Sequence, residues 1–287
     1  MRNQTKAKIV RRATKSGLPP LGGYLRETYR FRTFALKWSA GELKARNFET
    51  ILGRIWHYLN PFLFALIYFV FIGILSGGGT NSTVRLAHIT AGLYIWTLFS
   101  STITSSVSSI KSGGGGVLAL SAIPRVIIPL ASTVTAINLF LRSIIAYIPL
   151  HILAKKGLHV EMLSIPLLII LTGLFAFGLA LIFATLNVYL RDVSRLLPHF
   201  LRFWLYLSPA IWEYTRILGD GTLETCARLN PMFSGMTAWT IALGGPLDTN
   251  GPSILGQIGV FTIWAVATVI VGFIFFVSRE EEFAVRN

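Results

Sequence analysis

Long apolar segments alternate with short polar segments over most of the chain. A transmembrane helix needs about 20 mainly apolar residues to cross about 30 Å of hydrocarbon. Segments of this kind occur at Tyr58–Leu75, His88–Ser109, Val126–Leu153, Leu163–Asn187, Leu196–Tyr214 and Ile254–Val277. The fifth is the least regular, because Pro198, Arg202 and Pro209 interrupt it. The pattern predicts an all-α membrane protein with six transmembrane helices.

The uncharged segment Leu229–Leu247 differs from these spans. Asn230-Pro231, Gly235 and Gly244–Pro246 interrupt it, and a spanning helix would not be broken in this way. Non-helical backbone at membrane depth is stable only where protein or a water-filled cavity surrounds it. We therefore expect a re-entrant helical hairpin on the outer side, between spans five and six. A seventh crossing would carry the C-terminus to the outside.

The chain before the first apolar segment is predicted to form a separate cationic region. Residues 1–20 are basic and polar and predict a flexible tail, whereas residues 21–54 have helical periodicity before the membrane domain of residues 55–287. At 100° per residue, one arc of this helix is apolar and the opposite arc is cationic. The apolar arc comprises Tyr24, Phe31, Phe34, Ala35 and Trp38, and the cationic arc comprises Arg26, Arg30 and Lys37. We expect an amphipathic helix at the cytoplasmic membrane surface, either a plain anchor beside anionic lipid or a substrate contact.

Positive charge is concentrated on one side of the apolar segments. The formal net charge is +14, and half of the 26 lysine and arginine residues precede Ile55. Cytoplasmic loops of membrane proteins carry the excess of Lys and Arg, so we expect both termini in the cytoplasm. An even number of crossings also places both termini on the same side of the membrane. The attached membrane domain disfavours a nucleic-acid partner for the basic N-terminus.

The sequence offers little catalytic or metal-binding chemistry. Leu75–Thr80 (LSGGGT) is close to the signature of ABC ATPases, but it lies at the outer end of a membrane segment, and the chain has no GxxxxGK[ST] phosphate loop. The membrane cores hold no Asp or Glu, which disfavours ion-coupled transport. The 5 histidines lack metal-ligand spacing, and the single Cys226 excludes an intrachain disulfide. We therefore expect no enzymatic activity, cofactor or metal in this chain.

Arg142 and several aromatic rings are candidates for contact with a polar substrate inside the membrane. Arg142 lies mid-span, where an unpaired charge costs about 2.5–3.5 kcal/mol on insertion scales. It either faces the lumen or a substrate, donates hydrogen bonds to carbonyls of a neighbouring helix, or lies in a span shifted enough for its side chain to reach the membrane surface. The aromatic rings form either interfacial belts or a surface on which sugar rings can stack and slide. The expected conduit residues are Trp96, Phe99, Phe140, Arg142, Trp204 and Tyr206.

Several short motifs follow one another along the chain. They are RNFETILGRIWHYLNP at Arg46–Pro61, GLYIW at Gly92–Trp96, IPR at Ile123–Arg125, NVYLRDV at Asn187–Val193, LYLSPAIW at Leu205–Trp212 and LNP at Leu229–Pro231. Their order and spacing cover almost the whole chain and resemble the permease subunit of ABC exporters for polysaccharides, of the O-antigen and teichoic-acid type. The link Lys111–Arg125 departs from the family pattern, because Gly113–Gly116 and Ser121 replace more polar or basic residues.

The resemblance implies a homodimer of six-helix subunits in the bacterial inner membrane, in contact with membrane lipids and two copies of a separate ABC ATPase chain. ATP and Mg would bind to that partner. The cargo would be a long glycan, such as an O-antigen, a galactan or a teichoic-acid-like polymer, on a polyprenyl pyrophosphate. The implied roles are headgroup capture by Arg26, Arg30, Lys37, Arg46 and Arg54, an outer gate at Asn230, Pro231 and Trp239, and ATPase coupling at Gly113, Gly114, Leu118, Leu120 and Arg125.

Two competing functions and one question about the cytoplasmic link remain at this point. An ABC-2 exporter of a small lipid or drug would share the helix count but lack the cationic N-terminal helix. A membrane-embedded lipid-glycan transferase would need a carboxylate cluster near the cytoplasmic face, and the sequence has none. The four glycines Gly113–Gly116 either allow a close backbone approach to the ATPase or provide only slack.

Overall fold

The computed structural model describes residues 20–46, 82–112, 123–214, 221–245 and 253–283, together with scattered residues between 55 and 70. All regular secondary structure in the five continuous ranges is helical, which confirms the predicted all-α class. The α-helices are α1 (Leu21–Arg30), α2 (Arg32–Arg46), α4 (Ser82–Ser112), α6 (Ile127–Ser143), α7 (Ile148–Leu153), α8 (Ile165–Tyr189), α9 (Val193–Tyr206), α10 (Gly221–Arg228), α11 (Pro231–Ala242) and α12 (Ile254–Arg279). Short 3-10 turns are η2 (Ile144–Tyr147), η3 (Val160–Ser164) and η5 (Glu280–Glu282).

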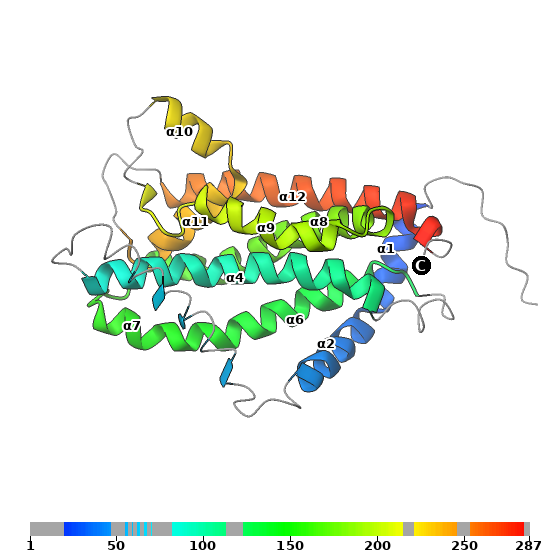
Figure 1. The fold of residues 1–287 in the computed structure, drawn as a ribbon, viewed down its shortest axis with the longest axis horizontal. Coiled ribbons are helices and arrows are strands. Elements are labelled where there is room, and N and C mark those ends of the chain that lie inside the picture. The colour runs from blue at the N-terminus through cyan, green and yellow to red at the C-terminus, as the bar shows by residue number, and fades with distance from the viewer. Residues whose placement is uncertain are drawn as a thin grey trace, which may run out of the picture.

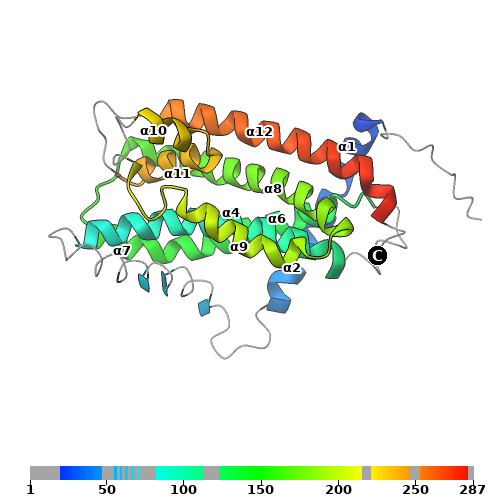
Figure 2. The same cartoon turned by 45° about the horizontal axis from the view of Figure 1, so that its top comes forward.

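The long helices run side by side in one bundle (Figure 1). Helix α8 packs against α4 and α12, and α4 packs against α6. The bundle has two distinct ends (Figure 2). The end with α1, the start of α6 and the last residues of α12 is called the α1 end below. The opposite end, with α7, α10 and α11, is called the α11 end.

Four helical segments are long and apolar enough to cross a membrane: Val84–Ile110, Ile127–Leu153, Val160–Tyr189 and Ile254–Arg279. They match the second, third, fourth and sixth predicted spans in position. The segment Ile127–Leu153, which matches the third predicted span, is not one regular helix, because the 3-10 turn η2 joins α6 to α7. Pro149, in the first turn of α7, has no N–H to continue the helical hydrogen-bond ladder. The first predicted span, Tyr58–Leu75, lies mostly outside the described residues.

The fifth predicted span, Leu196–Tyr214, is wrong as a single helix. Helix α9 has 14 residues, and at 1.5 Å per residue it is about 21 Å long. The backbone leaves the helix at Leu207 and turns through the residues that follow. Pro209 explains the break, because proline disfavours helical backbone at the residue before it. By itself α9 is therefore too short to cross about 30 Å of hydrocarbon.

Helix α11 occupies the segment predicted to be a hairpin. It has 12 residues, too few to cross a membrane, and its residues from Met232 onwards are buried against α4, α8 and α12. Asn230 caps its first turn with Pro231 next to it, and Gly244, with φ of +70°, follows its end. The expected break at Gly235 is wrong. Gly235 lies inside α11, where a Cβ would fall 2.7 Å from the Phe261 ring.

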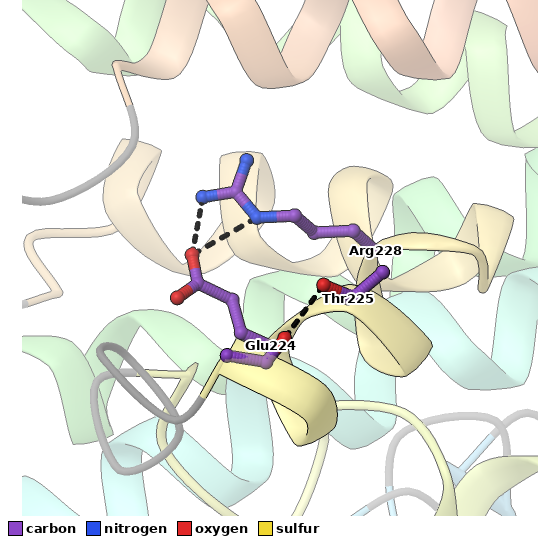
Figure 3. A network of polar contacts seen from close by, with 4 residues as sticks. Glu224, Thr225 and Arg228 are labelled. Carbon is purple, nitrogen blue, oxygen red and sulfur yellow. Dashed lines mark hydrogen bonds and ion pairs between the residues drawn. The ribbon is translucent and has the colours of Figure 1, made fainter.

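Helix α10 precedes α11 and lies at the surface of the α11 end (Figure 1). Contacts between its own side chains and turns stabilise it (Figure 3). Arg228 Nε donates to Glu224 Oε1 at 3.0 Å, and Thr225 Oγ1 donates to the Gly221 carbonyl at 2.6 Å. Exposed pairs of this kind contribute only about 0.3–0.5 kcal/mol. The position of α10 therefore depends mainly on its link to α11.

Helices α8 and α12 approach each other closely where two glycines, Gly178 and Gly272, face each other. A Cβ at Gly272 would fall on the Gly178 carbonyl, and a Cβ at Gly178 would fall on the backbone of Thr268. Small residues at such a crossing let two membrane helices approach backbone to backbone, which increases van der Waals contact. The Gly178–Gly272 contact therefore sets the spacing of these two helices.

We predict that Gly272→Ala lowers the melting temperature of the detergent-solubilised protein, because α12 must move away from α8. Overpacking of this kind costs about 1–3 kcal/mol. Gly259→Ala is the matched control, since Gly259 lies on the same helix and has no atom within 4 Å of the added Cβ position. Equal melting temperatures for the two variants would contradict the proposed helix contact.

Candidate functional site

Helix α9 exposes polar side chains along its whole length. Its apolar face, formed by Leu197, Leu201 and Leu205, is buried against the bundle. The opposite face is exposed and carries Arg195, His199, Arg202 and Tyr206. At 100° per residue these four side chains fall within an arc of about 60°. We call them the polar stripe of α9.

The polar stripe lies beside the middle of the bundle. The Trp204 ring, on the neighbouring side of α9, lies 5.3 Å from Phe99 and 6.3 Å from Phe175, measured between ring centroids. Phe99 and Phe175 are near the centres of α4 and α8, which are long enough to span a membrane. The end of the stripe with Arg202 and Tyr206 therefore lies near the middle of the membrane-spanning segments, whereas Arg195 lies close to the end of α8.

The outward faces of α12 and of the α6–α7 segment are mainly apolar at this depth, although Asn138 and Arg142 of α6 are partly exposed. Helix α12 exposes Ile263, Val266 and Ile270, and the α6–α7 segment exposes Leu141, Ile145, Ile148 and Ile152. These faces suit contact with lipid chains. Ionisable side chains in membrane-spanning segments almost always face a bundle interior or a water-filled cavity. The polar stripe is therefore the best candidate for a surface that contacts a polar substrate.

Two asparagines position α9 at its ends. At the start, buried Asn187 on α8 donates to the Val107 carbonyl of α4 at 3.3 Å and accepts from the Ser194 backbone N–H at 3.2 Å. At the end, Asn230 Oδ1 accepts from Trp204 Nε1 at 2.8 Å, while Asn230 Nδ2 donates to the Leu207 carbonyl at 3.1 Å. These bonds fix the orientation of α9 relative to α4, α8 and α11.

The side chains expected to line a conduit are divided between the core and the surface. Trp96, Phe99 and Phe140 are 6%, 0% and 3% exposed, so they have almost no free surface in this conformation. Trp96, Phe99 and Trp204 belong to one ring cluster, whereas Phe140 lies against Trp239. Tyr206 is exposed, and Trp204 and Arg142 are partly exposed.

The side chains expected to form an outer gate hold α11 in place. Asn230 also accepts from the Met232 backbone N–H at 3.0 Å, and Pro231 occupies the first turn of α11. Trp239 is fully buried and donates from Nε1 to the Ala91 carbonyl of α4 at 2.9 Å. Asn230 and Trp239 therefore hold α11 against its neighbouring helices.

The cationic N-terminal region forms two helices, α1 and α2, which meet at Phe31. Its predicted amphipathic pattern agrees with the burial: Arg26, Arg30 and Lys37 are exposed, whereas Ala35 is buried. The apolar arc packs on protein as well, since Tyr24 lies 5.7 Å from the Phe273 ring and α2 packs along α6. The Arg46 side chain and Arg54 lie outside the described residues.

A hydrogen-bonded cluster joins three distant segments at the α1 end. Tyr24 Oη donates to Glu280 Oε2 at 2.6 Å, the Arg125 backbone N–H donates to Glu280 Oε1 at 2.7 Å, and Arg125 Nη1 donates to the Glu280 carbonyl at 3.0 Å. Burial and the Glu280 carboxylate raise the pKa of the Tyr24 hydroxyl well above its usual range, so it remains a donor. We call Tyr24, Arg125 and Glu280 the C-terminal clasp.

The clasp accounts for one of the residues expected to couple to an ATPase. Arg125 is bound by hydrogen bonds to Glu280, directly after α12. Gly113, Gly114, Leu118 and Leu120 lie outside the described residues. Sequence reasoning did not predict Arg195, His199, Arg202, Tyr24 or Glu280 as site residues. The spacing of Arg195, His199, Arg202 and Tyr206, at intervals of 4, 3 and 4 residues, is the signal that could have found the polar stripe.

Comparison with known proteins gives consistent results over most of the chain. A family model described as ABC-2 type transporter matches residues 40–243. An O-antigen export system permease protein RfbA from Myxococcus xanthus is 26% identical over 262 residues, which cover 91% of this chain and 97% of that protein. Two proteins of the same description from Klebsiella pneumoniae are 29% and 27% identical, over 76% and 85% of this chain and 83% and 90% of their own lengths.

We predict that Tyr24 and Glu280 are energetically coupled. In a double-mutant cycle of Tyr24→Phe and Glu280→Gln, measured by unfolding in detergent, the coupling free energy should be about 0.5–3 kcal/mol, as for residues in contact. Thr225→Ala, on α10 at the opposite end of the bundle, is the control partner for Glu280→Gln. That pair should be additive within about 0.5 kcal/mol. Additivity of the Tyr24 pair would contradict the clasp.

Proposed function

This chain belongs to the ABC-2 type transporter family, as its motifs indicated, and we propose that it is the membrane-spanning subunit of an ATP-driven polysaccharide exporter. Its cargo is a glycan linked to a polyprenyl pyrophosphate, moved from the cytoplasmic side across the bacterial inner membrane. Relatives named O-antigen export permeases, similar over most of their length, support a glycan cargo. A protein path is needed, since moving one hydroxyl into hydrocarbon costs about 4–8 kcal/mol and a sugar carries several.

The observation that carries this proposal is the polar stripe of α9. It offers cationic and hydroxyl groups at membrane depth on the outside of a single bundle. One subunit alone cannot enclose a path along its own outer surface. A second copy with its α9 facing the first would enclose the path, which supports a homodimer.

The energy for export comes from a partner ATPase. The sequence contains no phosphate loop, so ATP and Mg bind to a separate ABC ATPase, two copies per homodimer. The C-terminal clasp ties the loop before α6 to α1 and to the end of α12. A movement that the partner imposes on this loop would therefore reach two other segments of the α1 end.

The proposed topology has six crossings, with the α1 end in the cytoplasm. The excess of Lys and Arg before the first apolar segment supports this orientation. In this topology α9 and the turn after it form the fifth crossing, and α11 then enters the bundle again from the outer side. Arg26, Arg30 and Lys37 then face the inner surface, where they suit capture of the pyrophosphate, with Arg46 and Arg54 expected nearby.

We expect ATP-dependent movement of lipid-linked glycan when this chain and its partner ATPase are reconstituted together in proteoliposomes. The measurement is protection of the glycan from an externally added glycosidase, with and without ATP. Liposomes that hold this chain alone are the control and should show neither ATP turnover nor glycan movement. Glycan movement by the chain alone, or ATP turnover without movement in the complex, would contradict the proposal.

A further inference from the structure

Arg202 of the polar stripe, next to Trp204 at the depth of Phe99 and Phe175, carries more charge than a neutral glycan requires. Hydroxyl and amide groups could hydrogen-bond a neutral sugar, whereas a charged side chain at the bilayer centre costs about 2.5–3.5 kcal/mol on insertion scales. We propose that the polar stripe of α9 binds acidic groups repeated along the exported polymer, so that the cargo is an anionic polysaccharide. This inference rests on the proposed function and specifies its substrate class.

The stripe has the geometry of a ladder. Arg195, His199, Arg202 and Tyr206 present a polar group on each successive turn, and Arg195 and Tyr206 lie about 16 Å apart along the helix axis. One pyrophosphate could reach only part of this length. A polymer with an acidic group on each repeat can contact several positions at once and can pass from one to the next. Arginine suits this role, because its planar guanidinium binds carboxylates and phosphates in bidentate fashion.

The protein itself supplies few anions to the stripe. Helices α4 and α8, which pack against α9, contain no Asp or Glu. Asp192 is the nearby carboxylate, 3.9 Å from Arg195, and both side chains are more than three-quarters exposed, at 80% and 86%. An ion pair with that exposure contributes little. In the described part of the chain Arg202 has no ion pair, so an acidic cargo is the complementary partner.

A second copy of this chain does not provide the missing anions. In a twofold-symmetric dimer the same surface meets itself, so two α9 stripes would bring like charges together. Like-charge contacts oppose close packing. The stripes therefore face each other across a gap in which an anionic polymer neutralises both. Phe200 and Phe203, exposed beside the stripe, give sugar rings an apolar surface to slide on.

The test compares two cargos in proteoliposomes that contain this chain and its partner ATPase. Both cargos have the same polyprenyl pyrophosphate and the same chain length, and only one has a uronic acid in each repeat. Arg202→Gln should slow export of the acidic cargo about tenfold, as expected for a lost charge-assisted hydrogen bond, and export of the neutral cargo less than about twofold. Arg202→Lys keeps the charge but loses the bidentate geometry, and it should restore part of the acidic export.

Lys155→Gln is the control, because Lys155 is exposed in the loop after α7 at the α11 end and lies outside the stripe. It should affect both cargos equally, and all variants should melt at the same temperature. Equal slowing of both cargos by Arg202→Gln would overturn the inference and assign the stripe to the shared pyrophosphate. No slowing of either cargo would also overturn it. Failure of the unsubstituted complex to move either cargo would instead contradict the proposed function.

Discussion

The cost of placing polar groups in hydrocarbon is the constraint on which this structure depends. Most hydroxyls of α4 avoid this cost by hydrogen bonds within the helix, as when Thr97 and Thr102 donate to carbonyls four residues earlier in α4. Other polar side chains avoid the cost by donating hydrogen bonds to carbonyls of neighbouring elements, as do Asn187, Asn230 and Trp239. The polar stripe of α9 differs, because its groups point out of the bundle. A polar surface at this depth is stable only beside water or a polar partner.

The rest of the bundle holds that surface in a defined place. The Gly178–Gly272 contact brings α8 and α12 together, and α8 with α4 forms the surface on which α9 rests. Asn187 and Asn230 then fix the two ends of α9. Trp204 adds a ring cluster between them, since it also contacts Phe99 and Phe175. A site on helices anchored in this way is more rigid than one on loops.

The sequence predicted those parts of the fold that depend on apolar length. Four spans lie where hydropathy placed them, because about 20 apolar residues have few other stable positions. Local rules misjudged Gly235, which serves the contact with Phe261 and does not end a helix. Arg202 was recognised only as an interruption of a span. Burial also depends on tertiary packing, so depth along a span could not separate buried Phe99 and Phe140 from accessible Tyr206.

The most direct test of the account is the water accessibility of α9 in the membrane. Single cysteines at Arg202 and Tyr206 of α9, and at Ile263 and Val266 of α12, would be introduced in a Cys226→Ser background. Their reaction rates with a membrane-impermeant thiol reagent would be measured in sealed vesicles that expose the side to which the path is open. The account predicts that both α9 cysteines react much faster than both α12 cysteines. Equal rates at all four positions would contradict a water-filled path along α9.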